Sequence, residues 1–321
     1  MSILARSHMS ELTDQKRKSN GAAIMLALWA LLLLSAMVIS WALDIDSRLS
    51  ISGEGMRALK AEAAACSGAE VALHPFVNPG SSNLSGQVQS GASYEARLTG
   101  EGGRININWA VIGENQDRLE ILKRYLENKG IDLNERDTMV DSLLDWVSQN
   151  VGMHHLNAPP ESADYHPAHS LLSRVEELKK VFGWAEFTSQ PGWDDDFTVS
   201  TPMTSPIDVV WASRDVLLAL PGFTPEMVDR FIQAREGPDG IQGTEDDMQF
   251  KDVNDLAPVI GLRSEQLQQL LKSNLITFNT SIYRVTSVGK AGNATRTVQM
   301  VIDKQKNRGL GQRTVLTWKE F

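Results

Sequence analysis

An uncharged segment near the N-terminus constrains this chain more than any other feature. Residues 22–43 form an apolar run of 22 residues without a charged side chain. As an α-helix with a rise of about 1.5 Å per residue, such a run crosses a hydrocarbon layer about 30 Å thick. A basic triplet at residues 16–18 precedes the run, and Asp44 and Asp46 follow it. The positive-inside bias therefore predicts a single membrane span with residues 1–21 in the cytoplasm and the body exported.

A cleavage signal stands before the apolar run rather than after it. An ordinary secretory signal has an apolar stretch of roughly 7 to 15 residues and a small-x-small cleavage site, which residues 40–42 match poorly. On the other side, a short basic leader ends in Gly21 directly before Ala22. Glycine lets a protease backbone approach closely. This arrangement resembles the leader of type IV pilins and pseudopilins, which a prepilin peptidase cuts after the glycine. We expect cleavage between Gly21 and Ala22, and a plain uncleaved anchor is the alternative.

One position inside the apolar run departs from most pilins. The fifth residue after the expected cut is Leu26, where most pilins carry Glu. In a filament that carboxylate is thought to neutralise the amino terminus of a neighbouring subunit, where an unpaired charge is costly. A subunit at the very tip has no neighbour above it to neutralise. Lack of this Glu is a feature of the K minor pseudopilin of type II secretion systems.

The helical pattern continues beyond the membrane segment. Residues 44–75 are rich in Ala, and Pro75 predicts the end of the helix near Leu73. We expect one apolar face to pack on a globular head, formed by Leu49, Met56, Leu59, Ala63 and Ala69.

The globular part combines strand-like runs with a long helical stretch. Alternating apolar residues at 94–98 and 105–107 predict a hairpin after a loop at residues 78–91. Three more strand-like runs lie within residues 279–321. We expect one antiparallel sheet in a pilin-like head made of residues 76–108 and 279–321. Helical spacing in the intervening residues 109–278 predicts a helical insertion, so the predicted fold class is α+β.

Three short motifs occur in an order that resembles one family. They are Glu101-Gly102-Gly103-Arg104-Ile105-Asn106-Ile107-Asn108, Asp141-Ser142-Leu143-Leu144-Asp145-Trp146 and Val175-Glu176-Glu177-Leu178. With the leader and the missing Glu, they resemble the K-protein family of type II secretion systems over almost the whole chain from Gly21.

This resemblance implies a role and a location. The family's minor pseudopilin caps the pseudopilus with the I and J minor pseudopilins and helps to start its assembly for protein export. The implied partners also include prepilin peptidase and the inner-membrane assembly platform. The implied location is the inner membrane, single-pass with a periplasmic body, and the pseudopilus tip after assembly. The insertion is too bulky to be followed by another subunit above it.

A rival interpretation comes from two helix-hairpin-helix-like segments. Residues 217–225 with the following helix, and more weakly residues 259–263, resemble units that let backbone N–H groups approach a DNA phosphate. Thr224 and Arg263 stand where DNA-binding versions carry their second Gly. The chain has 40 acidic against 31 basic residues, and the segment between the two copies is strongly acidic. We therefore do not expect nucleic acid as a partner, and a membrane-anchored DNA-binding protein is the alternative function.

Carboxylates in two loops predict a possible calcium site. Asp239, Glu245, Asp246 and Asp247 lie in a short glycine-turned loop, and calcium takes six to eight oxygen ligands from such loops. A solvated acidic loop is the equal alternative, and the calcium binding known in K proteins favours a site. Glu161 with Asp164 is a second candidate.

The remaining reactive side chains predict no chemistry. Four histidines could offer imidazoles to zinc or nickel, but we expect a loop cluster without a metal: His154, His155, His166 and His169. The single cysteine, Cys66, sits at helical spacing among alanines, and we expect it to pack rather than react. No phosphate-binding loop, GxSxG motif or acid–base carboxylate pair is found in the sequence, so we expect no enzyme activity.

Overall fold

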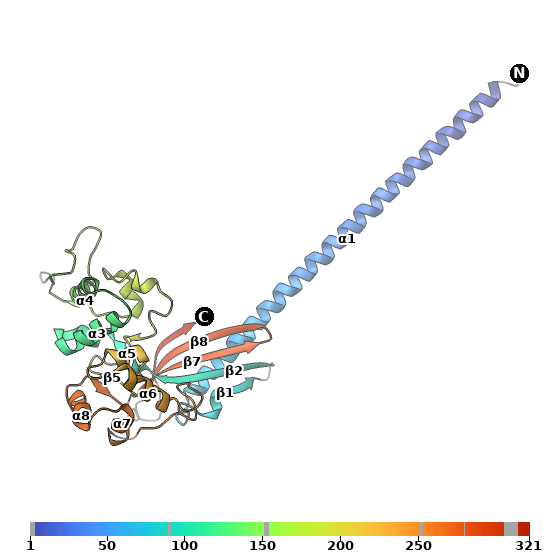
Figure 1. Cartoon of the computed structure of the whole chain (residues 1–321). Helices are drawn as coiled ribbons and strands as arrows, with labels where there is room; N and C mark the ends of the chain where they lie inside the picture. The colour runs from blue at the N-terminus through green and yellow to red at the C-terminus, as the bar shows by residue number, and fades with distance from the viewer. Residues whose placement is uncertain (1–3, 89–90, 151–153, 251–252, 279, 305–313) are drawn as a thin grey trace. The chain divides into compact units, whose positions relative to one another are not determined.

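The computed structural model describes residues 4–88, 91–150, 154–250, 253–278, 280–304 and 314–321, with residues 4–21 described by their backbone alone (Figure 1). The chain divides into two compact units, Met1–Leu59 and Lys60–Phe321. The first unit is entirely α-helical in its described part. The second unit holds a five-stranded sheet and a large, mainly helical region.

The first element is one uninterrupted helix, α1 (Leu4–Ala72). It contains a window with a mean hydropathy of 2.6, so it is long and apolar enough to cross a membrane. Its last turn closes at Ala72, before Pro75, as the sequence predicts. The long N-terminal helix that the sequence predicts is therefore confirmed, and Figure 1 labels it α1.

The buried face of α1 differs from the predicted one. Leu49, Met56 and Leu59 are 56–67% exposed, whereas Ala69 and its neighbours along one stripe are fully buried. That stripe consists of Ala61, Ala64, Ala65, Ala69 and Ala72. The prediction was right for Ala69 and wrong for the other four residues, because Leu49, Met56 and Leu59 precede Lys60, where the unit that holds the sheet begins, and Ala63 is exposed. Along the buried stripe the helix lies very close to the sheet. A Cβ atom added to Gly289 of the sheet would lie 1.9 Å from the carbonyl oxygen of Ala61.

The sheet is antiparallel throughout, with strand order β1-β2-β7-β8-β9. Its strands are β1 (Ser85–Val88), β2 (Ala92–Gly100), β7 (Ile282–Ala291), β8 (Ala294–Asp303) and β9 (Thr314–Glu320). The buried stripe of α1 shares a small core with alternate residues of these strands, among them Leu98, Val285 and Met300. The single antiparallel sheet, built from both ends of the globular part, confirms that part of the prediction.

One predicted strand pair is wrong. β2 pairs with β1, which arises from the predicted loop at residues 78–91, and not with residues 105–107. After β2, the 3-10 turn η2 (Glu101–Gly103) directs the chain away from the sheet. Its continuation β3 (Ile105–Asn106) pairs in parallel with β4 (Phe197–Thr198), and Ile107 already begins a helix. Alternation of apolar residues predicts that a segment forms a strand, but it does not predict with which other strand that segment pairs.

The region between β2 and β7 is mainly helical and has its own core. Its α-helices are α2 (Ile107–Val111), α3 (Gln116–Asn128), α4 (Leu133–Val147), α5 (Arg214–Ala219), α6 (Pro225–Arg235), α7 (Val253–Ile260) and α8 (Ser264–Lys272). Between α4 and α5 the described chain forms only short 3-10 turns and two-residue strands. These include η4 (Val175–Lys180), η5 (Phe187–Ser189) and β5 (Ile207–Asp208), the last pairing with β6 (Ile276–Thr277).

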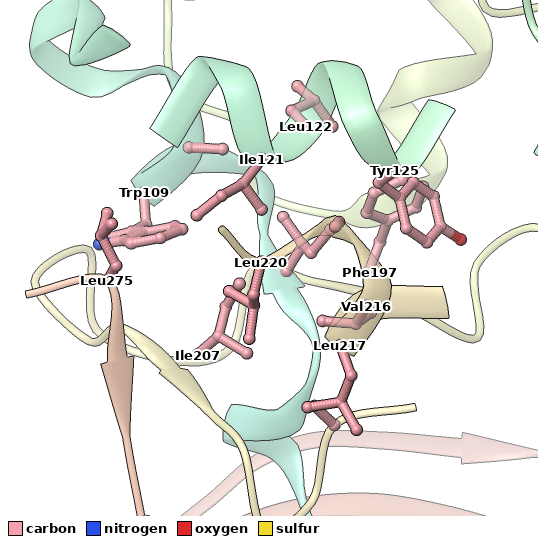
Figure 2. Packing of buried hydrophobic residues seen from close by; sticks show 14 of the residues in the cluster. Trp109, Ile121, Leu122, Tyr125, Phe197, Ile207, Val216, Leu217, Leu220 and Leu275 are labelled. Carbon is pink, nitrogen blue, oxygen red and sulfur yellow. The ribbon is translucent and has the colours of Figure 1, made fainter. Parts of the chain in front are cut away.

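Aromatic and branched side chains from distant segments fill the core of this region. Figure 2 shows Trp109, Ile121 and Tyr125 packing with Phe197 and Leu220. Tyr125 and Phe197 meet edge to face, with ring centroids 5.1 Å apart. This core is separate from the core under the sheet. The predicted division at residues 109 and 278 is compatible with two cores and stays a prediction.

Candidate functional site

The predicted processing site lies within α1. Gly21 and Ala22 are part of its continuous helical backbone. The large apolar side chains from Ile24 to Leu43 are 60–71% exposed, with Leu26 the most exposed of them. Exposure of such an apolar surface to water is unfavourable. The surface suits contact with lipid or with neighbouring apolar helices. Cleavage after Gly21 itself stays a prediction.

The first of the three motifs forms a buried junction. Glu101 is completely buried, and its carboxylate accepts two hydrogen bonds of 2.8 Å from Arg284, one of 3.1 Å from Arg104 and one of 2.6 Å from Thr198. Burial raises the pKa of Glu101, but the charges of Arg284 and Arg104 outweigh burial and hold the pKa below its ordinary value. Since Arg284 belongs to β7 and Thr198 to β4, this carboxylate ties the sheet to the helical region.

Two asparagines of the same motif also serve the structure. Asn106 caps α2, because its Oδ1 accepts hydrogen bonds from the backbone N–H groups of Asn108 and Trp109. Its Nδ2 donates to the carbonyl of Thr201 over 2.7 Å. The side chain of Asn108 bonds both backbone groups of Leu172. The motif thus holds three chain segments together rather than forming a reactive group.

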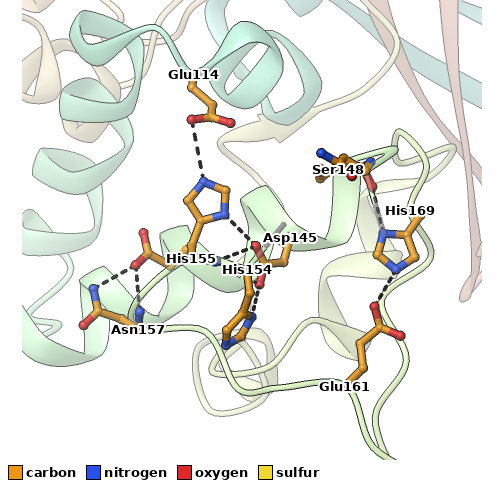
Figure 3. A network of polar contacts seen from close by, with 10 residues as sticks. Glu114, Asp145, Ser148, His154, His155, Asn157, Glu161 and His169 are labelled. Carbon is orange, nitrogen blue, oxygen red and sulfur yellow. Dashed lines mark hydrogen bonds and ion pairs between the residues drawn. The ribbon is translucent and has the colours of Figure 1, made fainter. Parts of the chain in front are cut away.

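The second motif supplies the hub of a histidine cluster, shown in Figure 3. The Asp145 carboxylate, 6% exposed, lies 2.9 Å from Nδ1 of His154 and 2.5 Å from Nδ1 of His155. The backbone N–H of His155 also donates to it over 3.1 Å. One turn earlier, the Asp141 carboxylate accepts two hydrogen bonds from Asn157. Nothing in the sequence singled out Asp145 as the partner of these histidines, because the pairing depends on how the loop folds back.

The two residues of the second predicted calcium pair have different described partners. Glu161 bonds Nε2 of His169 over 2.8 Å (Figure 3). It also lies 3.8 Å from Nδ1 of His166. Asp164 is exposed, and its described contact is a backbone hydrogen bond to Ser162. The carboxylate of Glu161 is therefore engaged by imidazoles. A calcium role for Glu161 and Asp164 stays a prediction.

The acidic loop at residues 239–247 does gather some of its predicted ligands. The hydroxyl of Thr244 donates to Asp246 over 2.8 Å and lies 3.3 Å from Asp247. The backbone N–H of Asp239 donates to Asp246, and that of Gly243 donates to Asp247 over 2.6 Å.

The electrostatics of the two gathered carboxylates differ. Burial raises the pKa of Asp247, whereas the Thr244 hydroxyl lowers that of Asp246. Glu245 is exposed, and its carboxylate makes no hydrogen bond or ion pair among the described residues.

These oxygens suit calcium in kind but are incomplete in number. Within the described part of the chain, no three carboxylate, imidazole or thiol groups converge as a metal ion requires. Two adjacent carboxylates and the backbone carbonyls of a glycine-rich loop could supply hard oxygen ligands of the sort that calcium takes. Calcium binding at Asp239, Glu245, Asp246 and Asp247 therefore stays a prediction.

The two helix-hairpin-helix-like turns are packed and capped. Gly222 adopts a φ of +86° between α5 and α6, and Gly261 a φ of +83° between α7 and α8. At the position of the second Gly, Thr224 caps α6 with its hydroxyl, and Arg263 bonds Gln266 at the start of α8. Phe223 and other turn residues join the helical core. At both turns, a side chain therefore bonds the start of the following helix at the position where DNA-binding versions carry glycine.

The fold places the chain in the class of α+β proteins in which a long N-terminal helix packs on an antiparallel sheet. No family model matches the sequence, and no curated protein matches it. Among solved structures it is similar to a chain of the crystal structure of the GspK-GspI-GspJ complex from the enterotoxigenic Escherichia coli type 2 secretion system. The TM-score is 0.56 and the sequence identity 12%, over 87% of this chain and 99% of that one. The likeness confirms the fold that the ordered motifs implied.

Proposed function

We propose that this chain is a minor pseudopilin of a type II secretion system. The observation that carries the proposal is the combination of an exposed apolar helix, continuous with a helix packed on an antiparallel sheet, and a helical insertion between β2 and β7. A chain of the GspK-GspI-GspJ complex is similar in fold over 87% of this chain, which supports the proposal. Its role is assembly, and catalysis is not part of it.

The finer proposal concerns processing and position. Prepilin peptidase cuts after Gly21, and Ala22 becomes the first residue of the mature chain. The protein then stands at the pseudopilus tip with I-type and J-type minor pseudopilins, assembled from the inner-membrane platform, with its body in the periplasm. Lack of an acidic residue at Leu26 and the bulk of the insertion support the tip position. Repeated copies along the filament shaft would contradict it.

The first experiment measures the intact mass and N-terminal sequence of the full chain, purified from membranes with and without prepilin peptidase. We expect a chain that begins at Ala22 only when the peptidase is present. Gly21→Leu places a side chain at the scissile bond and should block the cut, whereas the matched variant Ser19→Ala should be cut normally. A wild-type chain that keeps residues 16–21 despite an active peptidase would make it a fixed anchor.

The DNA-binding alternative has its own test. The full chain in detergent micelles is titrated with duplex DNA at low salt. The capped turns and acidic surroundings predict no binding. Binding that weakens steeply as salt rises would favour the alternative, because phosphate contacts release counterions.

A further inference from the structure

The segment that follows α4 is fastened to that helix by a buried carboxylate. Asp145 lies near the end of α4, and its two oxygens face Nδ1 of His154 and Nδ1 of His155, at 2.9 and 2.5 Å (Figure 3). The imidazole of His155 is 18% exposed and that of His154 is 45% exposed. Between these histidines and Asn157 lies Leu156, which at 94% is the most exposed large apolar side chain among the described residues.

The charge balance of this contact depends on protons. A carboxylate that is almost out of water is stabilised by hydrogen bonds and by a positive partner. Two imidazole Nδ1 atoms and the backbone N–H of His155 lie at hydrogen-bond distance from Asp145, and protonation of an imidazole adds the positive charge. On its far side, Nε2 of His155 lies 3.6 Å from Glu114, which adds a second negative charge. A protonated His155 therefore bridges two carboxylates, whereas a neutral one leaves at least one of them without a cationic partner.

The other ionisable groups near the contact between Asp145 and the histidines either favour a protonated imidazole or stay neutral. Asp141, one turn earlier on α4, is a further negative group and bonds Asn157. Tyr165 feels Asp145 at longer range, and burial with that charge raises the pKa of its phenol, so it stays neutral. His169, which also feels the charge of Asp145, bonds the carbonyl of Ser148.

We propose that Asp145, His154 and His155 form a proton-operated latch, closed on α4 when the imidazole of His155 is protonated and released when it loses its proton. Release frees residues 154–157 from the helix and changes how Leu156 is presented to a neighbouring surface. The proposal concerns the monomer, and it holds whether or not the chain is a pseudopilin.

The direction of the pH dependence follows from His155. Burial disfavours its charged form, but the hydrogen bond and charge of Asp145, with Glu114, raise its pKa above the ordinary value. The imidazole of His155 therefore binds its proton more tightly in the closed form of the latch than in the released form. Closure is fully favoured below the pKa of a free imidazole, near 6.5, and is lost as pH rises through the higher value of the closed form. Each pH unit between the two values changes the closing equilibrium about tenfold.

The test is hydrogen exchange of the full chain in detergent micelles, followed by mass spectrometry between about pH 6 and about pH 8.5 in buffers with EDTA. Rates are corrected for intrinsic exchange, and peptides from α3 serve as the internal reference. We expect protection in peptides that cover residues 154–170 to fall as pH rises, about tenfold for each pH unit by which closure raises the pKa of His155. Protection in α3 should stay constant.

Two variants separate the latch from general unfolding. His155→Gln keeps a polar side chain but no titratable proton, and it should show weak protection of the segment that does not change with pH. His74→Gln, a histidine outside the cluster, should behave as the wild type. Histidine labelled with carbon-13 gives a second measurement, in which the signal lost in His155→Gln should titrate above 6.5 in the wild type. Protection of the segment that is constant across this pH range, or unchanged in His155→Gln, would overturn the proposal.

Discussion

At the scale of single residues, the structure explains the ordered motifs by buried polar contacts. Glu101 meets two arginines, Asn106 caps a helix, and Asp145 meets two histidines. Motif matching in the sequence identified these positions without their roles, because Arg284, Thr198 and Thr201 lie far away along the chain and the two histidines lie in a loop. For the calcium candidates, the sequence showed which residues carry suitable oxygen ligands. It did not show whether these oxygens lie close together.

Loss of the Glu101 charge should destabilise the protein strongly. Glu101→Gln would leave Arg284 and Arg104 in a buried site without their anionic partner, which costs about 3–5 kcal/mol in comparable buried pairs. Urea unfolding followed by tryptophan fluorescence measures the change. The matched variant Glu95→Gln removes an exposed charge on β2 and should change stability by less than about 0.5 kcal/mol. Equal effects of the two substitutions would contradict the structural role of Glu101.

Asp208 should make stability fall as pH rises. It is completely buried, and burial raises the pKa of its carboxyl to about 7, although the backbone of Val210 and Thr280 opposes the rise. The folded state thus holds this proton more tightly than the unfolded state, whose value is 3.8. Stability is lost between about pH 4 and pH 7, by up to about 4 kcal/mol, and levels off above that range.

Asp208→Asn removes this titration. We expect a flatter pH dependence of the free energy of unfolding, with the variant gaining on the wild type from pH 5 to pH 8. Exposed Asp164→Asn, measured in EDTA, is the control and should keep the wild-type slope. The same slope in Asp208→Asn would show that Asp208 does not titrate as described.

Calcium should raise the melting temperature if the acidic loop binds it. A ligand that binds only the native state stabilises it by mass action. We expect a higher melting temperature of the full chain in excess calcium than in EDTA, and a smaller increase in Asp247→Asn. Glu161→Gln tests the second candidate separately. An unchanged melting temperature in the wild type would contradict calcium binding at either place.

At the scale of elements, the closest contact is between α1 and the sheet. The helix presents Ala61, Ala65 and Gly68 to Ser287 and Gly289 of β7. A Cβ atom on Gly68 would lie 2.4 Å from the hydroxyl of Ser287. Helical periodicity in the sequence predicted the helix and its end, but of the five residues of the predicted face only Ala69 is buried. The small face packs instead, because close approach requires small side chains.

Gly289→Ala should disturb this contact. The added methyl group would meet the backbone of Ala61 and Ala65 at 1.9 and 2.4 Å, and backbone cannot rotate away. We expect a loss of about 1–3 kcal/mol in the free energy of unfolding. Gly55→Ala is the matched control, since a Cβ there meets nothing within 4 Å among the described residues. In a helix interior that substitution should leave stability unchanged or raise it by about 0.5–1 kcal/mol. A similar response of both variants would argue against close packing.

At the scale of the whole molecule, the two units differ in how their apolar side chains are placed. The first is an exposed apolar helix that needs lipid or other helices around it, and the second is a folded body with two cores. Neither feature supports an enzyme or a nucleic-acid carrier. The apolar helix is consistent with the membrane anchoring that the proposed function requires.

The proposed function predicts stable association with other minor pseudopilins. Co-expressed with I-type and J-type minor pseudopilins, the full chain should co-purify with both in detergent. The control is co-expression with a major pseudopilin in place of these two partners. It should yield a smaller amount of the co-purified complex. Purification of the chain alone in the presence of both partners would contradict the proposed tip complex.

The sequence by itself determined the long apolar helix and its end, the α+β class, most of the insertion helices and the family resemblance. These depend on local periodicity, on proline and on the order of motifs along the chain. Only the tertiary structure decided the partners: β1 beside β2, the alanine face of α1 against β7, Glu101 with Arg284 and Asp145 with His155. Apart from the local pair β1 and β2, these contacts join residues that are distant along the chain or held in irregular loops. Their choice depends on packing distance and on the burial of charge, which no local pattern encodes.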